Sequence, residues 1–309
     1  MDMDYNSKLF AMAAGLVASG YDLYDAANAD GILDLARDVG QITLDEHIYR
    51  WFKAAKTGQV AVNPYWPRGH VAIMATYFCK DEAIDLAGFM EFYDKLGIAD
   101  PVGRDGFCDW LAQLPQVLAY MQGKMERFLA RYWALVGSCM PRWLPMLEQS
   151  RKAAADFFGD NAPQLIFAPN LLFSPYATDF VRVGGKIVVI ATAPDAESVL
   201  HEALHDAVGL HRDKIIAFAE KHGLGGLVEF DKMMALGYMH DDSAASCARA
   251  IEECIVRAVS VMLARGGKER LKAHAADGFV GVLRTGDLFG QIRPSVRGLG
   301  GFIAELLPA

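Results

Sequence analysis

Apolar side chains recur every three to four residues along most of the first 160 positions, which is the spacing of helices that bury one face or more. Short segments rich in Gly, Pro and Asp separate these runs. Gly20 is expected to end the first helix, and Pro141 is expected to interrupt the helical pattern near the end of this region. Helices are predicted at residues 6–19, 33–39, 44–56, 71–78, 80–96, 110–121, 122–138 and 143–158.

Beyond residue 160 the pattern changes to short runs rich in β-branched residues, which predict strands. The run at 186–191, Lys-Ile-Val-Val-Ile-Ala, is the strongest strand signal in the chain. Two glycines join it to a similar run at 179–183, and this spacing indicates a β-hairpin. A shorter apolar run at 164–168 lies between two prolines.

Helical patterns then return. Asp195 can cap a helix that begins near residue 196, and Gly209 can close it. The longest helix expected in this half of the chain spans 243–265, and another spans 268–276. The expected fold class is therefore α+β, mainly helical, with a small β-hairpin or sheet.

Composition and charge exclude several classes of protein. Hydrophobic residues make up 53% of the 309 residues and charged residues 22%, which is a globular composition with enough apolar mass for a sizeable core. The formal net charge is −8 and no block of Lys and Arg forms a basic stripe, so we expect no nucleic-acid partner. The longest apolar run near the start, 9–19, is about half a bilayer span, so we expect no membrane partner.

The expected compartment is the cytoplasm. The residues before the first apolar run are acidic, whereas a secretory signal carries positive charge there. The five cysteines are widely spaced and form no CxxC pair, which argues against paired disulfides and against a cysteine-based zinc site. We expect them to be buried free thiols.

The sharpest chemical motif is His-Glu-Ala-Leu-His at residues 201–205, an HExxH. Positions i and i+4 of a helix share one face, so the imidazoles of His201 and His205 can reach one metal ion. Glu202 lies beside this pair, where it can take a proton from water bound to that metal. The flanking residues are mostly small or apolar, which indicates a buried helix whose polar side chains need partners. One Zn²⁺ ion is such a partner, and two core histidines with ordinary hydrogen bonds are the alternative.

A third metal ligand must come from outside the motif. The strongest candidates are the adjacent residues Glu252 and Glu253, which lie among apolar residues on the longest helix of this half. We prefer Glu253, whose helix face also carries Arg257. Arg257 can hold the second oxygen of that carboxylate or bind a carboxylate of the substrate.

Three other residues remain open as third ligands. Two are acidic residues nearer to the motif, and one is a histidine at the spacing of the third ligand in metzincins. The glycine of the metzincin pattern is displaced here by one position, to Gly209. These candidates are Glu229, Asp231 and His211.

Together these motifs resemble the gluzincin superfamily of zinc metallopeptidases. The hairpin before HExxH, the opening Gly-Tyr-Asp-Leu-Tyr-Asp at 20–25 and Glu-x-x-Val-Arg-Ala at 253–258 are similar to a group of little-characterised bacterial metallopeptidases. The resemblance mainly covers residues 164–265. It implies one zinc ion held by His201, His205 and Glu253, with Glu202 as general base. It also implies a zincin-like catalytic region at 161–309, which we expect to form one compact unit with a helical region at 1–160.

The chain departs from the thermolysin pattern at Arg257, where an Asp would orient a ligand imidazole. Asp206 or a main-chain carbonyl is expected to take over that role. The side chains expected around the metal ligands are Asp206, Glu252 and Arg257.

The implied reaction is zinc-dependent hydrolysis of peptide bonds in a peptide or protein substrate. Glu202 would accept a proton from water and pass it to the leaving amine. The developing oxyanion needs a hydrogen-bond donor, for which Tyr238 and His240 are the expected residues and Tyr176 is a weaker one. The sequence leaves cleavage specificity and oligomeric state open.

Two competing functions also fit the sequence. The chain can be a catalytically silent zincin fold that binds a peptide or a protein partner. It can also be a structural helical protein in which the HExxH is accidental. An intact Glu202 argues against the silent fold, because a protein that only binds needs no general base.

Overall fold

The computed structural model describes residues 2–24, 29–56, 66–96, 106–175 and 178–308. They belong to two compact units, and each unit is assembled from separate stretches of the chain. Unit one contains Met146–Leu165 and Asp195–Ala309, and unit two contains Asp2–Pro145 and Ile166–Pro194. Each unit therefore draws on both sides of residue 160.

The chain is mainly helical with a small sheet, which confirms the expected α+β class at that level. The core of unit two is built around α1, whose residues from Leu9 to Val17 are all buried. Gly15 lets α3 approach closely, because a Cβ at that position would overlap the ring of Phe52. The helices of unit two are α1 (Ser7–Ala18), α2 (Ile32–Gly40), α3 (Glu46–Ala54), α4 (Pro67–Ala75), α5 (Leu86–Leu96), α6 (Phe107–Ala112) and most of α7 (Leu114–Phe158).

The larger sheet has the strand order β1-β4-β6-β5, with bounds β1 (Asp2–Met3), β4 (Gln164–Pro169), β5 (Asp179–Val183) and β6 (Lys186–Ala191). Strand β1 pairs with β4 in parallel, and β5 pairs with β6 antiparallel. The predicted hairpin is confirmed. Gly184 and Gly185 both have positive φ, which a two-residue hairpin turn requires and glycine adopts without strain.

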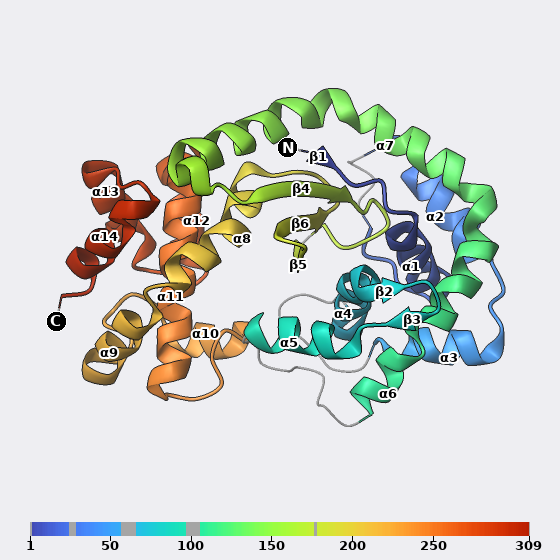
Figure 1. Cartoon of the computed structure of the whole chain (residues 1–309), viewed down its shortest axis with the longest axis horizontal. Helices are drawn as coiled ribbons and strands as arrows, with labels where there is room; N and C mark the ends of the chain where they lie inside the picture. Colours follow the sequence, from blue (N-terminus) through green and yellow to red (C-terminus); the bar gives the residue numbers. More distant parts are fainter. Residues whose placement is uncertain (1, 25–28, 57–65, 97–105, 176–177, 309) are drawn as a thin grey trace. The chain divides into compact units, whose positions relative to one another are not determined.

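The predicted break at Pro141 is wrong. Helix α7 is a continuous helix of 45 residues that contains both Pro141 and Pro145, and Figure 1 shows it as one curved helix. A proline removes one backbone hydrogen bond, but packing on both sides can keep the helix intact and bend it. Here Cys139, Trp143 and Leu147 are buried around the two prolines and supply that packing.

The helix predicted at 80–96 begins later than expected. Residues before it form a two-stranded hairpin of β2 (Cys79–Lys80) and β3 (Ala83–Ile84). Asp81 in its turn has a φ of 51°, a left-handed conformation that ends helical structure. The local apolar spacing therefore predicted the helix but not the turn in front of it.

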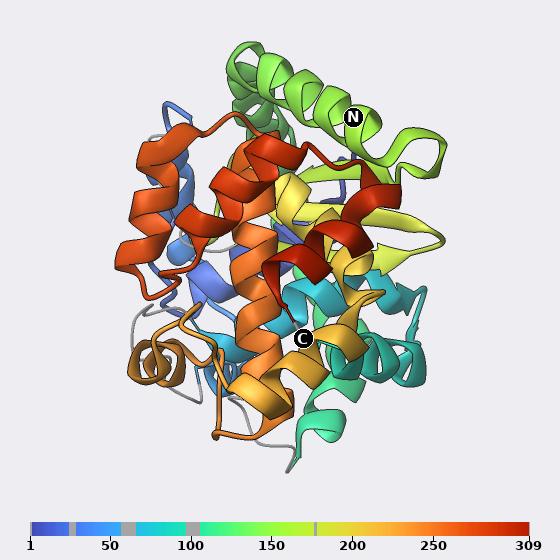
Figure 2. The same cartoon turned by 90° about the vertical axis from the view of Figure 1, so that its left-hand side faces the viewer.

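Unit one is a helical assembly around α11. It contains α8 (Ala196–Gly209), α9 (Arg212–His222), α10 (Phe230–Leu236), α11 (Ala244–Leu263), α12 (Gly267–Ala276), α13 (Val282–Ile292) and α14 (Leu299–Leu306). Figures 1 and 2 show α11 passing through the middle of these helices. Twelve of its residues are buried, which explains its apolar composition.

The predicted starts of α8 and α11 are confirmed, whereas α11 ends at Leu263, two residues before the predicted end. The Asp195 carboxylate accepts a hydrogen bond of 3.0 Å from the Ser198 amide, and the Ser243 hydroxyl accepts one of 3.3 Å from the Ser246 amide. Helix α13 lies beyond the last helix predicted from the sequence, 268–276. Gly286 is a contact point, since a Cβ there would lie 2.7 Å from the Leu271 side chain.

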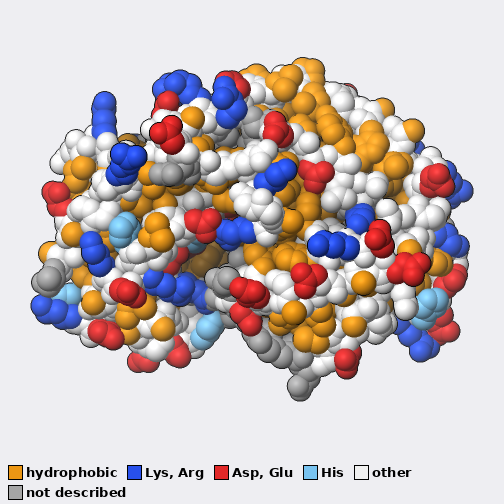
Figure 3. Space-filling model, in the orientation of Figure 1, with side chains coloured by type: hydrophobic (Ala, Val, Ile, Leu, Met, Phe, Trp, Pro, Cys, Tyr) orange, Lys and Arg blue, Asp and Glu red, His pale blue; other side chains and the backbone are white. Residues whose placement is uncertain are grey.

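The surface and the thiols add two observations. In the part of the chain that the structure describes, no helix has both the length and the apolar character needed to cross a membrane. On the face shown in Figure 3, Lys and Arg side chains are interspersed with Asp and Glu. All five cysteines are free, and four are buried, but Cys108 is exposed, so the expectation of burial is wrong there.

Candidate metal centre

Helix α8 presents the HExxH motif towards α11. Val199, Leu200, Ala203 and Leu204 are buried and fix the rotation of the helix. His201 and His205 then lie one turn apart on the same face, with their rings edge to face and their centroids 4.8 Å apart. The apolar spacing of α8 thus positions both imidazoles.

Glu253 of α11 completes a group of three possible metal ligands. The Nε2 atoms of His201 and His205 lie 3.1 Å apart. One carboxylate oxygen of Glu253 lies 3.4 Å from the first Nε2, and the other oxygen lies 3.4 Å from the second. Among the residues described, these three form the one group able to offer three such atoms to a metal ion.

The spacing of the two histidines is compatible with a tetrahedral zinc site. Zinc binds nitrogen and oxygen ligands at about 2.0–2.2 Å, so neighbouring ligand atoms in a tetrahedron lie about 3.3–3.6 Å apart. The two Nε2 atoms are 3.1 Å apart, each lies 3.4 Å from a different oxygen of Glu253, and one ligand atom from each of the three residues lies within 4.8 Å of the others. Two imidazoles and one carboxylate are also the donor set of several catalytic zinc sites.

Each of two ligands is held by a neighbour on α11. Glu252 Oε1 lies 3.2 Å from Nδ1 of His205, the ring nitrogen that faces away from the ligand group. Arg257 lies 2.8 Å from Glu253 Oε1. A carboxylate on the distal nitrogen of a ligand histidine fixes its tautomer and orientation. Glu252 and Arg257 therefore lie around the ligands as expected, whereas Asp206 is exposed.

The electrostatic surroundings favour a cation. Burial alone would raise the pKa of the Glu253 carboxyl, but Arg257 and the two imidazoles hold it well below its usual range. Burial alone would lower the pKa of His205, yet hydrogen bonds to Glu252 and Glu253 raise it to about 10. The negative charge that favours a proton on this imidazole equally favours a metal ion in place of the proton.

A buried polar chain extends from Arg257 and was missed in the sequence. Arg257 donates a 2.7 Å hydrogen bond to the Tyr238 hydroxyl and lies 3.2 Å from His274 Nδ1. The other nitrogen of His274 lies 2.5 Å from Glu197, which also binds Arg270 at 2.6 Å. Glu197 precedes His201 by one helical turn. This spacing was the one sequence signal that could have placed Glu197 on the same helix face as the motif histidines.

The remaining predicted residues occupy different places. Glu202 is buried beside the ligands, close enough for its charge to act on His205. Tyr238 is half-buried, and His240 is exposed and lies 3.5 Å from Arg249. Tyr176 lies outside the described residues. The three alternative third ligands lie outside the ligand group. Glu229 and Asp231 are exposed, next to and on α10 respectively, and His211 lies against Gly300.

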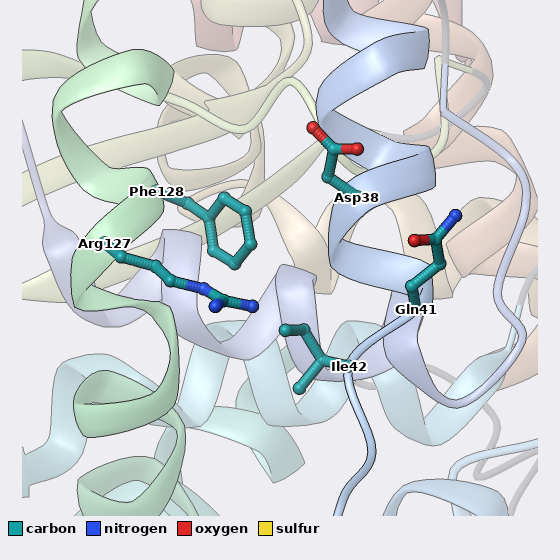
Figure 4. Close-up of a pocket in the computed structure, with 5 residues that line it drawn as sticks. All are labelled: Asp38, Gln41, Ile42, Arg127 and Phe128. Carbon is teal, nitrogen blue, oxygen red and sulfur yellow. The ribbon is translucent and has the colours of Figure 1, made fainter.

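Unit two contains a separate hollow of about 450 Å³ between α2 and α7. Figure 4 shows Arg127 and Phe128 of α7 pointing towards α2 and the residues that follow it. Asp38 at its rim is paired with Arg131 at 2.6 Å. The one carboxylate among the described residues that line the hollow is this paired Asp38, so the α8–α11 site carries the functional argument.

Comparisons with protein-family models, with curated proteins and with solved structures find no match to this chain. Function must therefore be inferred from the chemistry of unit one.

Proposed function

We propose that this chain is a zinc-dependent hydrolase of peptide bonds, built on the plan of the gluzincins with a zincin-like core. The observation that carries the proposal is the triangle of His201, His205 and Glu253, with separations of 3.1–3.4 Å. It joins an HExxH helix to a glutamate on a second helix. The alternative, two core histidines hydrogen-bonded to carboxylates, predicts a protein that retains no zinc, which the experiment below measures.

The roles of the residues follow from their positions. A zinc ion held by the three ligands would supply a Lewis acid that polarises a carbonyl and acidifies water. Glu202 takes a proton from water and delivers it to the leaving amine. Glu252 orients His205, and Arg257 orients Glu253. Tyr238 and His240 remain the proposed donors to the oxyanion.

The test uses purified full-length protein, metal analysis by mass spectrometry and a quenched fluorescent peptide library. Wild type is expected to retain one zinc ion per chain and to cleave peptides. Glu202→Gln should keep the zinc and lose roughly 10²–10⁴-fold in rate, because it removes only the base. Glu253→Gln should lose the zinc. Glu269→Gln on α12 is the matched control, since this glutamate is exposed and pairs only with Lys272.

Two results would contradict the proposal. One is a wild-type protein that holds no zinc after equilibration with micromolar zinc. The other is hydrolysis that is equal in wild type and Glu202→Gln. Zinc binding without any hydrolysis would instead support the catalytically silent fold.

A further inference from the structure

A second feature of unit one is the group formed by two arginines, Arg249 and Arg212, and by His240. Arg249 lies on α11 one turn before Glu253, on the same face of the helix. His240 Nε2 lies 3.5 Å from its guanidinium. Arg212 begins α9, which packs against α11. We refer to these three residues as the arginine cluster.

The arginine cluster has no anion of its own. Among the described residues, neither Arg212 nor Arg249 forms an ion pair with a carboxylate within 4 Å. Arg249 is half-buried, and its pKa is lowered by burial and by the nearby charge of Arg212. An anion that binds to the half-buried Arg249 would offset both its burial and its repulsion by the exposed Arg212.

The metal site adds to this positive charge. A divalent ion with two neutral imidazoles and one carboxylate keeps a net positive charge. Glu252 and Glu253 act on Arg249, but both are already engaged, by His205 and by Arg257 respectively. Glu202 and Glu252 offset the remaining charge of the metal site and of Arg257, so an incoming anion is attracted mainly by Arg249 and Arg212.

We propose that Arg249 and Arg212 bind a carboxylate of the peptide substrate close to the bond that is cleaved. This inference rests on the proposed peptidase function and names its substrate class. A guanidinium matches a carboxylate through two parallel hydrogen bonds.

The distance along α11 limits which carboxylate this is. One helical turn separates Arg249 from Glu253, which is about 5–6 Å along the axis. An extended peptide covers that distance in about two residues. The anion is therefore the C-terminal carboxylate of the substrate or an Asp or Glu side chain within about two residues of the cleaved bond.

The test measures binding separately from hydrolysis. Zinc-loaded Glu202→Gln protein is titrated with fluorescein-labelled hexapeptide pools whose positions are random but contain no Asp or Glu, and binding is followed by anisotropy. One pool has a free C-terminal carboxylate, a second has a C-terminal amide, and a third is the amide with one fixed internal Asp. At least one carboxylate pool is expected to bind roughly 10-fold more tightly than the plain amide pool.

The same titration is repeated after adding Arg249→Gln, Arg212→Gln or the control Arg297→Gln, an exposed arginine on η4 (Val296–Gly298). Either of the first two should remove the preference for carboxylate, and the control should keep it. The exposed Arg212 serves as the second variant if Arg249→Gln does not fold. Which pool shows the preference distinguishes the two sources of the carboxylate.

Equal binding of all three pools, including no binding by any of them, would overturn the inference. A preference that survives both arginine variants would also overturn it. Hydrolysis by wild type without any carboxylate preference would leave the peptidase function standing and remove this inference alone. A carboxylate preference without hydrolysis by wild type would support this inference and contradict the peptidase function.

Discussion

Adjacent residues on α11 take different tasks because they point in different directions. Glu253 faces the Nε2 atoms of both histidines, whereas Glu252 reaches Nδ1 of His205 from the other side of the ring. Neighbouring positions on a helix are rotated by about 100°. The same imidazole is thus held between two carboxylates, one beside the metal position and one behind it.

At the scale of a residue, Glu252→Gln should weaken zinc binding by roughly 10–100-fold without abolishing it, because it loosens the ring of His205 but leaves all three ligands in place. Competition with a chromogenic chelator measures this affinity. Glu269→Gln is the control and should match wild type. An unchanged affinity in Glu252→Gln would show that this carboxylate does not support the site.

Helix α8 carries three polar residues at one-turn spacing, Glu197, His201 and His205. The last two face α11. The first binds His274 and Arg270 of α12. One helix therefore docks two others through polar contacts, and each contact lies on a largely buried face.

The docking of α12 should depend on pH. Burial alone would raise the pKa of Glu197, but His274 and Arg270 lower it below its usual range, and Asp195 is the other charged group near Arg270. A carboxyl whose pKa is lowered by folding stabilises the folded state above its unfolded pKa of about 4.3. This stabilisation is lost as the pH falls through the lower, folded value.

At the scale of an element, Glu197→Gln should therefore lower the free energy of unfolding by about 1–3 kcal/mol at pH 7, and the difference from wild type should shrink towards zero below about pH 4. Urea unfolding at pH 7, 5 and 3 measures it. A chelator is present throughout so that metal loss contributes nothing. A difference that is as large at pH 3 as at pH 7 would contradict the assignment.

At the scale of the whole molecule, the tryptophans and the proposed metal ligands belong to different units. All five tryptophans, at positions 51, 66, 110, 133 and 143, belong to unit two. The proposed metal ligands all belong to unit one. Tryptophan fluorescence therefore reports on one unit, whereas far-ultraviolet circular dichroism reports on the helices of both.

At this scale, removing zinc with a chelator should lower the thermal transition seen by circular dichroism by about 10 °C, since a ligand present at 100 to 1,000 times its Kd contributes about 3–4 kcal/mol. The transition seen by tryptophan fluorescence should move less. Glu253→Gln should show no response to zinc in either signal. Equal shifts in both signals would mean that the two units unfold together.

The sequence by itself determined the features that depend on a few neighbouring residues. The hairpin follows from two glycines that adopt positive φ, and the starts of α8 and α11 follow from Asp195 and Ser243, whose side chains cap amides three residues later. The HExxH spacing placed His201 and His205 together, since four residues make about one helical turn.

Only the tertiary structure decided features that join distant parts of the chain. Glu252 lies 47 positions from His205, and Glu197 lies 77 positions from His274, so no local pattern could show that these residues are paired. The continuity of α7 through Pro141 depends in the same way on packing around the helix. Local hydrogen bonds and turns are fixed by sequence neighbours, whereas the partners of a buried charge are fixed by which helices pack together.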